Sequence, residues 1–256
     1  MNETTIAIQL VQQAGEIMSG SWGNQSIKVE HKGVIDPVSE IDKKVEALIV
    51  SGLRRAFPRY SILAEEGSTV DQGSTSRWII DPLDGTTNYL HSYPFVSISI
   101  GLEKDGQLVM GVVYNPILDE LYVAEDGGGA TLNGIPINVS TSPQLGGAVL
   151  ASGFPYDAWT VEENNSREWA AFVKRCMSLR CDGSAALDMC HVACGRVDGY
   201  WEKGLFPWDI AAGAIIAKEA GAWVGDYSGG MDFLSKGEVV VANLNLARQI
   251  RDVLNE

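Results

Sequence analysis

The 256-residue sequence has little positive charge, few histidines and no long apolar run. Nineteen Lys and Arg residues face 33 Asp and Glu residues, which gives a formal net charge of −14. This charge disfavours binding to nucleic acid or to an anionic membrane, because both are negatively charged. No apolar run approaches the roughly 18 residues of a membrane span, and no basic-then-apolar signal peptide begins the chain. We therefore expect a cytoplasmic protein that binds neither membrane nor nucleic acid directly.

Cysteine is scarce as well, and its spacing argues against a zinc site. The four cysteines contain no Cys-x-x-Cys pair, and all lie within residues 176–194. Cys190 and Cys194 lie four residues apart, on one face of a predicted helix, which favours free thiols packed in the core. The three histidines lack a partner motif, so no Ser–His or Cys–His nucleophile is indicated.

The apolar residues, 45% of the chain, suffice for one large domain or two closely packed parts. Hydrophobic spacing predicts a helix over residues 4–19 that ends at Gly20. A second helix starts at Ser39 with Asp42 completing a capping box, and ends near Phe57. Alternating strands and Gly-containing turns predict an antiparallel sheet in the first half. We expect a single domain over residues 1–256, with possible subdomains 1–140 and 141–256.

The remaining predictions assign short strands and amphipathic helices along the rest of the chain. Residues 31–37 and 67–77 are predicted to be loops. The predicted strands cover residues 25–30, 60–64, 78–80, 95–102, 108–114, 119–124, 149–156, 197–201 and 239–242. The predicted helices of the second half cover residues 167–177, 183–194, 208–221 and 246–254.

The stretch from Trp78 to Asn88 carries the strongest chemical signal. Three apolar residues predict a buried strand that ends at Asp81, because Pro82 cannot donate to a sheet ladder. Asp84 and Gly85 then favour a turn whose following amides can face an anion. Carboxylate, hydroxyl and carbonyl oxygens suit a hard cation such as Mg²⁺. A strand that ends in an Asp–Gly turn is also a common structural feature, so this stretch alone does not decide the function.

Four carboxylates are predicted at the ends of strands or at the start of a helix, where folds often build sites. They are Glu65, Asp81, Asp84 and Asp209. The sequence alone leaves open whether they meet. If they do, their repulsion would require divalent ions to neutralise it.

The motifs around these carboxylates resemble those of the inositol monophosphatase family over nearly the whole chain. The closest matches are Asp81-Pro82-Leu83-Asp84-Gly85-Thr86-Thr87-Asn88, Leu63-Ala64-Glu65-Glu66-Gly67 and Trp208-Asp209-Ile210-Ala211-Ala212-Gly213. Further matches are Asp36-Pro37-Val38-Ser39-Glu40-Ile41-Asp42, Gly183-Ser184-Ala185-Ala186-Leu187 and Gly195-Arg196-Val197-Asp198-Gly199-Tyr200, nearest to the bacterial inositol-1-monophosphatase branch. The resemblance implies an α/β (α+β) fold, a layered αβαβα sandwich of the inositol monophosphatase and fructose-1,6-bisphosphatase type. It also implies a homodimer.

The resemblance assigns roles residue by residue. It implies that two or three Mg²⁺ are held by Glu65, Asp81, the carbonyl of Leu83, Asp84 and Asp209. Asp42 and Thr86 match the pair that polarises the attacking water, so the catalytic residues would be Asp42, Glu65, Asp84 and Thr86. The substrate-binding residues would be Asp84, Gly85, Thr86, Gly183, Ser184, Ala185, Glu202 and Asp209. The sequence departs from the family at Ala64, where many members have Gly, and at Pro37 and Ser39, where Leu and Thr are usual.

The implied activity is Mg²⁺-dependent hydrolysis of myo-inositol monophosphate, or related small polyol phosphates, by metal-activated water without a phosphoenzyme. Fructose 1,6-bisphosphate, histidinol phosphate and 3′-phosphoadenosine 5′-phosphate are alternative substrates of related enzymes. A different alternative is an accessory factor that binds RNA polymerase or ribosome-assembly partners, as some bacterial relatives do. Sensitivity to lithium is a family trait that we also expect here.

Overall fold

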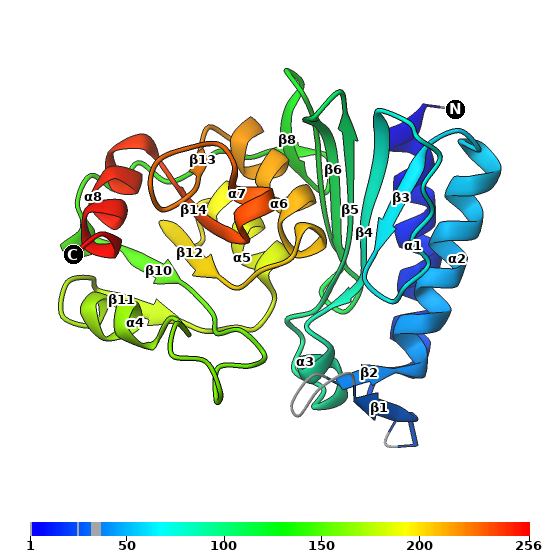
Figure 1. Cartoon of the computed structure of the whole chain (residues 1–256), viewed down its shortest axis with the longest axis horizontal. Coiled ribbons are helices and arrows are strands. Elements are labelled where there is room, and N and C mark those ends of the chain that lie inside the picture. The colour runs from blue at the N-terminus through cyan, green and yellow to red at the C-terminus, as the bar shows by residue number, and fades with distance from the viewer. Residues whose placement is uncertain (1, 25, 32–36) are drawn as a thin grey trace.

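The computed structural model describes residues 2–24, 26–31 and 37–256, and these form alternating layers of helices and sheets. Helices α1 and α2 cover one face of a seven-stranded sheet, and α5 and α6 lie between that sheet and a five-stranded one (Figure 1). Helices α4 and α8 cover the far face of the smaller sheet. The predicted αβαβα sandwich is therefore confirmed. Among the described residues, no helix is both long and apolar enough to span a membrane.

The first helical layer consists of α1 (Glu3–Ser21) and α2 (Glu40–Ala56). Helix α1 continues through Gly20 to Ser21, two residues beyond the predicted range of 4–19. The predicted capping box of α2 is confirmed: the Ser39 backbone N–H donates to Asp42 Oδ2 at 2.9 Å. The box fixes the Asp42 carboxyl at the start of the helix, where its charge is favoured by the helix dipole.

The larger sheet has the order β3-β4-β5-β6-β7-β8-β9, and only β3 and β4 run parallel to each other. The antiparallel sheet predicted for the first half is therefore confirmed, including the Asn133-Gly134 hairpin between its last two strands. The strands are β3 (Ser61–Ala64), β4 (Ser76–Asp84), β5 (Ser97–Lys104), β6 (Gln107–Asn115), β7 (Glu120–Glu125), β8 (Gly129–Leu132) and β9 (Ile135–Pro136).

Strand β4 corrects one prediction, because it does not end at Asp81. Asp81 pairs with Ser99 of β5, and after an irregular step Asp84 pairs with Ser97. Between these pairs, two residues of β4, Pro82 and Leu83, oppose the single residue Ile98 of β5. Pro82 thus falls within the irregularity, where a missing N–H is tolerated. The irregularity delivers two carboxylates from one continuous strand.

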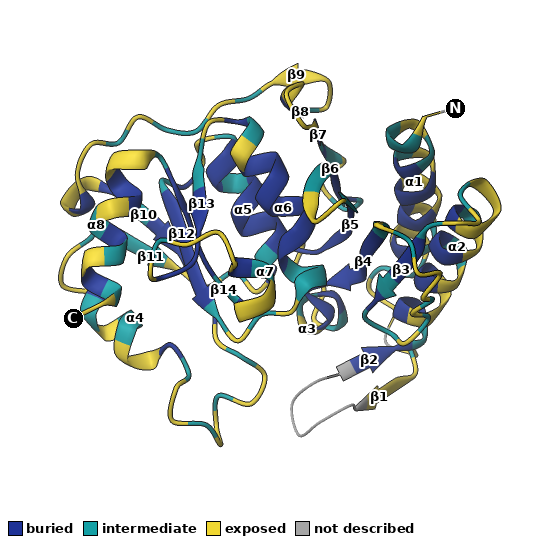
Figure 2. Cartoon of the chain, turned by 45° about the horizontal axis from the view of Figure 1, so that its top comes forward, coloured by how far each residue is buried: buried dark blue, intermediate teal, exposed yellow. Residues whose placement is uncertain are grey.

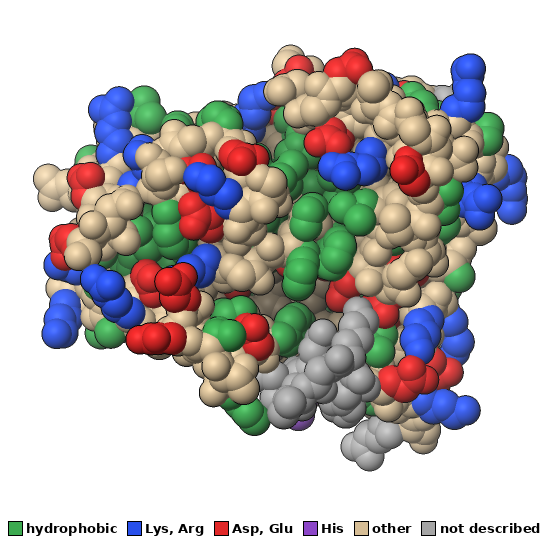
Figure 3. All heavy atoms as spheres, in the orientation of Figure 1, with side chains coloured by type: hydrophobic (Ala, Val, Ile, Leu, Met, Phe, Trp, Pro, Cys, Tyr) green, Lys and Arg blue, Asp and Glu red, His purple; other side chains and the backbone are tan. Residues whose placement is uncertain are grey.

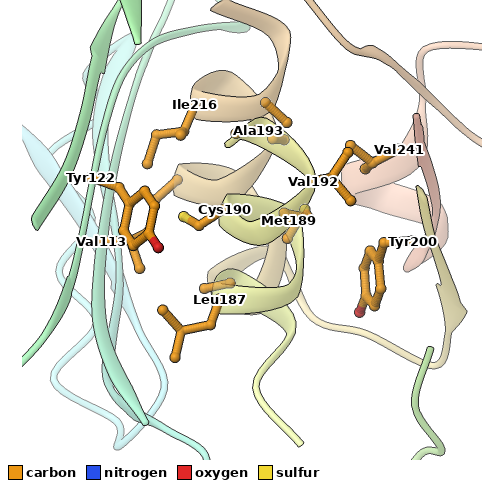
Figure 4. Close-up of a cluster of buried hydrophobic side chains, with 14 of the residues drawn as sticks. Val113, Tyr122, Leu187, Met189, Cys190, Val192, Ala193, Tyr200, Ile216 and Val241 are labelled. Atoms are coloured by element: carbon orange, nitrogen blue, oxygen red, sulfur yellow. The ribbon is translucent and has the colours of Figure 1, made fainter. Parts of the chain in front are cut away.

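The middle layer consists of α5 (Ala185–Ala193) and α6 (Pro207–Glu219), which pack against each other and against both sheets. Gly111 of β6 allows α6 to approach closely, since a Cβ there would lie 2.5 Å from the Ala212 carbonyl oxygen. Figure 4 shows Cys190 of α5 in the core that faces Val113 and Tyr122 of the larger sheet. Cys190 is a buried free thiol, as predicted, whereas Cys194 is only half-buried.

The smaller sheet has the mixed order β11-β10-β12-β14-β13. Its strands are β10 (Val149–Ala151), β11 (Ser178–Arg180), β12 (Gly199–Lys203), β13 (Trp223–Gly225) and β14 (Glu238–Ala242). The helices around it are α4 (Ser166–Phe172), α7 (Phe233–Lys236) and α8 (Leu244–Leu254). Strands β11 and β13 and helix α7 were not predicted because they are short, and α4 ends five residues earlier than predicted. Figure 2 shows the sheets and the middle helices mostly buried, with exposed residues on the outer faces.

Short elements complete the fold. Strand β1 (Val29–His31) pairs with β2 (Pro37–Ser39), and helix α3 (Thr86–Leu90) follows β4 directly. A 3₁₀ turn, η1, covers Leu145–Gly147. The strand predicted over residues 25–30 was too early, because β1 begins at Val29. The predicted loop over residues 31–37 falls largely on residues 32–36, which lie outside the described part of the chain.

Candidate active site

Two adjoining pockets lie between the end of the larger sheet, α5, α6 and β12. The carboxylate pocket, about 220 Å³, is lined by Glu65, Asp81, Leu83, Asp84, Thr86 and Asp209, among others. The adjoining pocket, about 380 Å³, is lined by residues of 84–88, 153–156, 181–188 and 202–209. Asp84, Glu202 and Asp209 line both, so the two pockets form one continuous cleft. On the face shown in Figure 3, Lys and Arg side chains are scattered among the Asp and Glu side chains.

Sheet register and a helix start bring the four predicted carboxylates into the carboxylate pocket. Glu65 follows β3, and its backbone N–H donates to the Ile80 carbonyl at 3.3 Å, so Glu65 lies beside Asp81 on the neighbouring strand. Asp209 lies in the first turn of α6, where its Oδ2 accepts the Phe206 backbone N–H at 2.7 Å. Residues far apart in the sequence thus share one cavity.

Burial raises the proton affinity of Asp81, Asp84 and Asp209, and acidic neighbours add to this effect at Asp81 and Asp209. Burial raises the pKa of Asp81 well above its ordinary value, and the nearby charges of Glu65, Asp84 and Asp209 raise it further. The pKa of Asp209 is also raised, mainly by burial and then by its acidic neighbours. Burial raises the pKa of Asp84 to about 6, although hydrogen bonds from Ser184 and the start of α5 oppose this shift. A cation in the pocket would relieve both the repulsion and the lost hydration.

Asp84 is fixed by the N-terminus of α5. Ser184 Oγ donates to Asp84 Oδ2 at 2.6 Å, and the Ala186 backbone N–H donates to the same oxygen at 2.9 Å. Ser184 also caps α5, so one hydroxyl connects the helix start with strand β4. Gly183 and Ala185 lie beside it and line the adjoining pocket.

Gly85 turns the chain from β4 into α3 with a φ of +90°, which favours glycine. A Cβ at this position would lie 3.0 Å from the Phe95 carbonyl and 3.1 Å from the Gly183 carbonyl, so a side chain would be crowded. Asn88 Nδ2 holds the two facing turns together, since it donates to the Phe95 and Asp182 carbonyls at 2.8 and 2.7 Å. The Gly85–Thr86 turn therefore has a defined position in the cleft.

Thr86 and Asp42 form a buried pair at the base of the carboxylate pocket. Thr86 Oγ lies 2.9 Å from Asp42 Oδ1 and 3.1 Å from the Leu83 carbonyl oxygen, so its single hydrogen is shared between these two acceptors. Burial raises the pKa of Asp42, whereas hydrogen bonds from Ser39 and Thr86 lower it. The pair can therefore accept and hold a proton through the Thr86 hydroxyl.

Glu202 lies in β12, within the strand, and its carboxylate is buried between the two pockets. Tyr200 Oη donates to Glu202 Oε2 at 2.7 Å and orients it. Burial raises the pKa of Glu202 to about 7, because the hydrogen bond from Tyr200 offsets only part of the lost hydration. Its second oxygen is available to a ligand hydroxyl.

Several residues of the cleft were not singled out from the sequence. Glu46 of α2 is buried and accepts the backbone N–H groups of Glu66 at 2.7 Å and Ser68 at 3.0 Å, which positions the turn after Glu65. Asp188 and Tyr156 line the adjoining pocket. Glu46 and Asp188 each lie four residues after a predicted site residue on a helix, so the helical period could have indicated them.

The donor set of the carboxylate pocket fits a hard divalent cation. Its lining offers carboxylate oxygens and the hydroxyls of Thr86 and Tyr156, includes no His or Cys among the residues that the structure describes, and also contains Leu83. Within the described residues, no three Asp, Glu, His or Cys side chains are arranged around one point as a finished ion site.

Comparison with known proteins gives matches over nearly the whole chain. A family model described as the inositol monophosphatase family matches residues 2–256. A Mesorhizobium japonicum protein named inositol-1-monophosphatase is 42% identical over 247 residues, 96% of this chain and 93% of the relative. A Vibrio cholerae protein named Nus factor SuhB is 42% identical over 240 residues, which cover 93% of this chain and 90% of the relative. The structure of an inositol monophosphatase from Anabaena, 39% identical, superposes with a TM-score of 0.89 and covers 98% of this chain and 94% of that one.

Proposed function

The chain belongs to the inositol monophosphatase family and is a phosphatase, and we propose that it hydrolyses myo-inositol monophosphate with Mg²⁺ as its cofactor. The observation that carries this proposal is the carboxylate pocket. Glu65, Asp209 and the β4 residues Asp81 and Asp84 come from three parts of the chain, yet line one cavity. Burial and the acidic neighbours raise the pKa of Asp81 and of Asp209. A protein that only binds other proteins gains nothing from such crowding.

The proposed metal ligands are Glu65, Asp81, the Leu83 carbonyl, Asp84 and Asp209. Two or three Mg²⁺ bound there would neutralise the phosphate charge and lower the pKa of water. We assign the phosphate oxygens to the turn amides of Gly85 and Thr86, since backbone N–H groups favour anions. The Thr86 hydroxyl, held by Asp42, accepts a proton from the attacking water and passes it to the buried carboxylate.

The alcohol part of the substrate is assigned to the adjoining pocket. Its volume of about 380 Å³ lies within the usual range for small-molecule sites. Gly183, Ser184, Ala185 and Glu202 line it and offer backbone, hydroxyl and carboxylate groups for ring hydroxyls. Asp84 and Asp209, which line both pockets, would contact the substrate where ester and ring meet.

The direct test is phosphate release from four purified esters: inositol 1-phosphate, fructose 1,6-bisphosphate, histidinol phosphate and 3′-phosphoadenosine 5′-phosphate. We expect inositol 1-phosphate to give the highest kcat/KM, and we expect release to stop when a chelator removes Mg²⁺. Undiminished turnover in excess chelator, or a trapped covalent phospho-residue, would contradict the mechanism. A higher kcat/KM for another ester would reassign the substrate and leave the chemistry unchanged.

The substitution Asp84→Asn tests whether the Asp84 carboxylate is required for catalysis. Removal of one charged ligand should cost about 4 kcal/mol of transition-state stabilisation, or about a thousandfold in kcat/KM. Asp252→Asn is the control, because it removes one negative charge from an exposed position on α8. The control should keep the wild-type rate, and a similar rate in both variants would exclude Asp84 from the catalytic site.

A second candidate function is suggested by relatives that are named Nus factor SuhB, one of them 42% identical to this chain. In this alternative the chain binds RNA polymerase or a ribosome-assembly partner through its surface, and catalysis is dispensable. Pull-down with purified RNA polymerase tests it. Binding that persists in Asp84→Asn would support the second role, and no binding by the wild-type protein would exclude a direct interaction with the polymerase.

Three further properties belong to the proposal because they accompany this activity in the family. We expect a homodimer, inhibition by Li⁺ that occupies a magnesium position, and a cytoplasmic location. Sedimentation of the purified protein and an assay at increasing Li⁺ with constant Mg²⁺ test the first two directly.

A further inference from the structure

Asp188 is a buried acidic residue of the adjoining pocket to which the family resemblance assigns no role. It lies one turn after Ser184 on α5, and both side chains line the adjoining pocket. Its relative exposure is 2%, and its Oδ1 is buried without a hydrogen-bond partner among the described residues. A buried oxygen without a partner is unfavourable by about 1–3 kcal/mol, so packing alone does not explain an acid at this position.

The surroundings of Asp188 indicate what it could bind. The acidic groups that face it are Glu202, Asp182 and Asp84, in decreasing order of influence. None of the described residues that line the adjoining pocket is Lys, Arg or His. Such a pocket offers hydrogen-bond acceptors to hydroxyl groups, but gives no cation to a second phosphate. The chemistry therefore favours a neutral polyhydroxylated ring over a bisphosphate.

We propose that Asp188 is a specificity-determining residue whose Oδ1 accepts a hydrogen bond from a hydroxyl of the substrate ring, opposite the hydroxyl held by Glu202. The inference rests on the proposed function, because it assigns the alcohol part of the ester to this pocket. It also explains why an oxygen that is unsatisfied in the free protein is retained: the substrate satisfies it. Asp188 does not contact the ester bond in this scheme, so it should affect binding of the alcohol more than the chemical step.

The test compares Asp188→Leu, which keeps the branched shape and removes the acceptor, with Asp188→Asn, which keeps an acceptor oxygen. Kinetics are measured on inositol 1-phosphate and on 4-nitrophenyl phosphate, whose leaving group has no hydroxyl besides the ester oxygen. Asp188→Leu should raise KM for inositol 1-phosphate about tenfold with little change in kcat, as expected for one lost hydrogen bond to a buried carboxyl oxygen. Its kinetics on 4-nitrophenyl phosphate should not change. Asp188→Asn should restore most of the lost affinity.

Thermal stability separates this role from a structural one. Replacement of an unpartnered buried oxygen by an apolar group should leave Tm unchanged or raise it. An unaltered KM for inositol 1-phosphate in Asp188→Leu would overturn the proposal. Equal losses on both esters, accompanied by a lower Tm, would also overturn it and make Asp188 a structural residue.

A binding assay keeps the inference testable if the wild-type protein releases phosphate from neither ester, an outcome that would refute the proposed function alone. Cys181 is an exposed thiol that lines the same pocket, whereas the other three thiols are buried or half-buried. Saturating myo-inositol should slow maleimide labelling of Cys181 in the wild-type protein. In Asp188→Leu, half-maximal protection should require an about tenfold higher myo-inositol concentration. Absence of protection in the wild-type protein, or equal protection in both proteins, would contradict the proposal.

Discussion

The two pockets of the cleft differ in how completely their polar groups are satisfied. In the carboxylate pocket, Asp84 accepts hydrogen bonds from Ser184 and Ala186, and Asp209 accepts one from Phe206. In the adjoining pocket, Glu202 accepts one from Tyr200, and Asp188 Oδ1 accepts none within the described residues. The acids that line the carboxylate pocket are thus held by hydrogen bonds, whereas Asp188, which lines only the adjoining pocket, leaves an acceptor open for a ligand. Substitutions in the two pockets should therefore have different consequences.

The largest effect on stability is expected from Glu202→Gln in the metal-free protein. Burial raises the pKa of Glu202 from 4.5 to about 7, so the folded state binds this proton more tightly than the unfolded state does. The stability that Glu202 contributes is therefore complete below pH 4.5 and is lost as the pH rises through 7. A shift of this size corresponds to about 3 kcal/mol in the free energy of unfolding. The Glu202→Gln variant does not lose this stability as the pH rises, because a Gln side chain does not ionise.

Urea unfolding at pH 4.5 and pH 8, in chelator, measures this difference. Between pH 4.5 and pH 8, the free energy of unfolding should fall by about 3 kcal/mol more in the wild-type protein than in Glu202→Gln. The wild-type protein must be compared with the variant at each pH, because His191 also titrates in this range. Burial lowers the pKa of His191 to about 4, so its contribution to stability increases with pH between pH 4 and 6.5. If the free energy of unfolding changes with pH in the same way in both proteins, ionisation of Glu202 does not destabilise the folded state, and the prediction is wrong.

Thr86→Val should have the next largest effect, and it should affect the chemical step. The substitution removes the hydroxyl that lies 2.9 Å from Asp42 Oδ1 and keeps the side-chain shape. We expect kcat to fall about a hundredfold, the usual loss for a proton-transfer group, with KM for inositol 1-phosphate nearly unchanged. Thr86→Ser keeps the hydroxyl and serves as the control. Equal kcat values for the Val and Ser variants would remove the hydroxyl from the mechanism.

Glu46→Gln should have the smallest effect, because Glu46 acts on the site through the backbone. Its carboxylate accepts the N–H groups of Glu66 and Ser68, and thereby fixes the turn that carries Glu65. Replacement of one acceptor oxygen by an amide should raise the Mg²⁺ concentration for half-maximal activity about tenfold, with kcat at saturating Mg²⁺ almost unchanged. A fall in kcat that added Mg²⁺ does not restore would mean that Glu46 has another role.

The local features of the fold could be predicted from the sequence, and the long-range ones could not. The capping box of Ser39 and Asp42 and the Asn133-Gly134 hairpin were correct because both depend on residues close in the chain. The continuation of β4 past Pro82 was missed because it depends on pairing of Asp84 with Ser97 across the sheet. Short strands such as β13 (Trp223–Gly225) carry too few residues for a periodic signal.

In the candidate site, too, local features could be predicted from the sequence and long-range contacts could not. Sequence spacing placed Asp81 and Asp84 together, but only the parallel pairing of β3 with β4 places Glu65 beside them. Asp209 reaches the pocket because α6 packs against the larger sheet, an arrangement that no local pattern encodes. Asp188 was missed because a single acid in the first turn of a helix is ordinarily explained by the helix dipole.

The most direct test of the account is calorimetric titration of the metal-free protein with Mg²⁺ at pH 6 in two buffers of different ionisation enthalpy. Because burial raises the pKa of Asp81, Asp84 and Asp209, and acidic neighbours raise that of Asp81 and Asp209 further, Mg²⁺ binding should be saturable and should release about one proton or more per chain. Asp81→Asn should weaken binding and reduce the proton release. Absence of saturable binding, or binding with the same heat in both buffers, would contradict the claim that these carboxylates form one cation site.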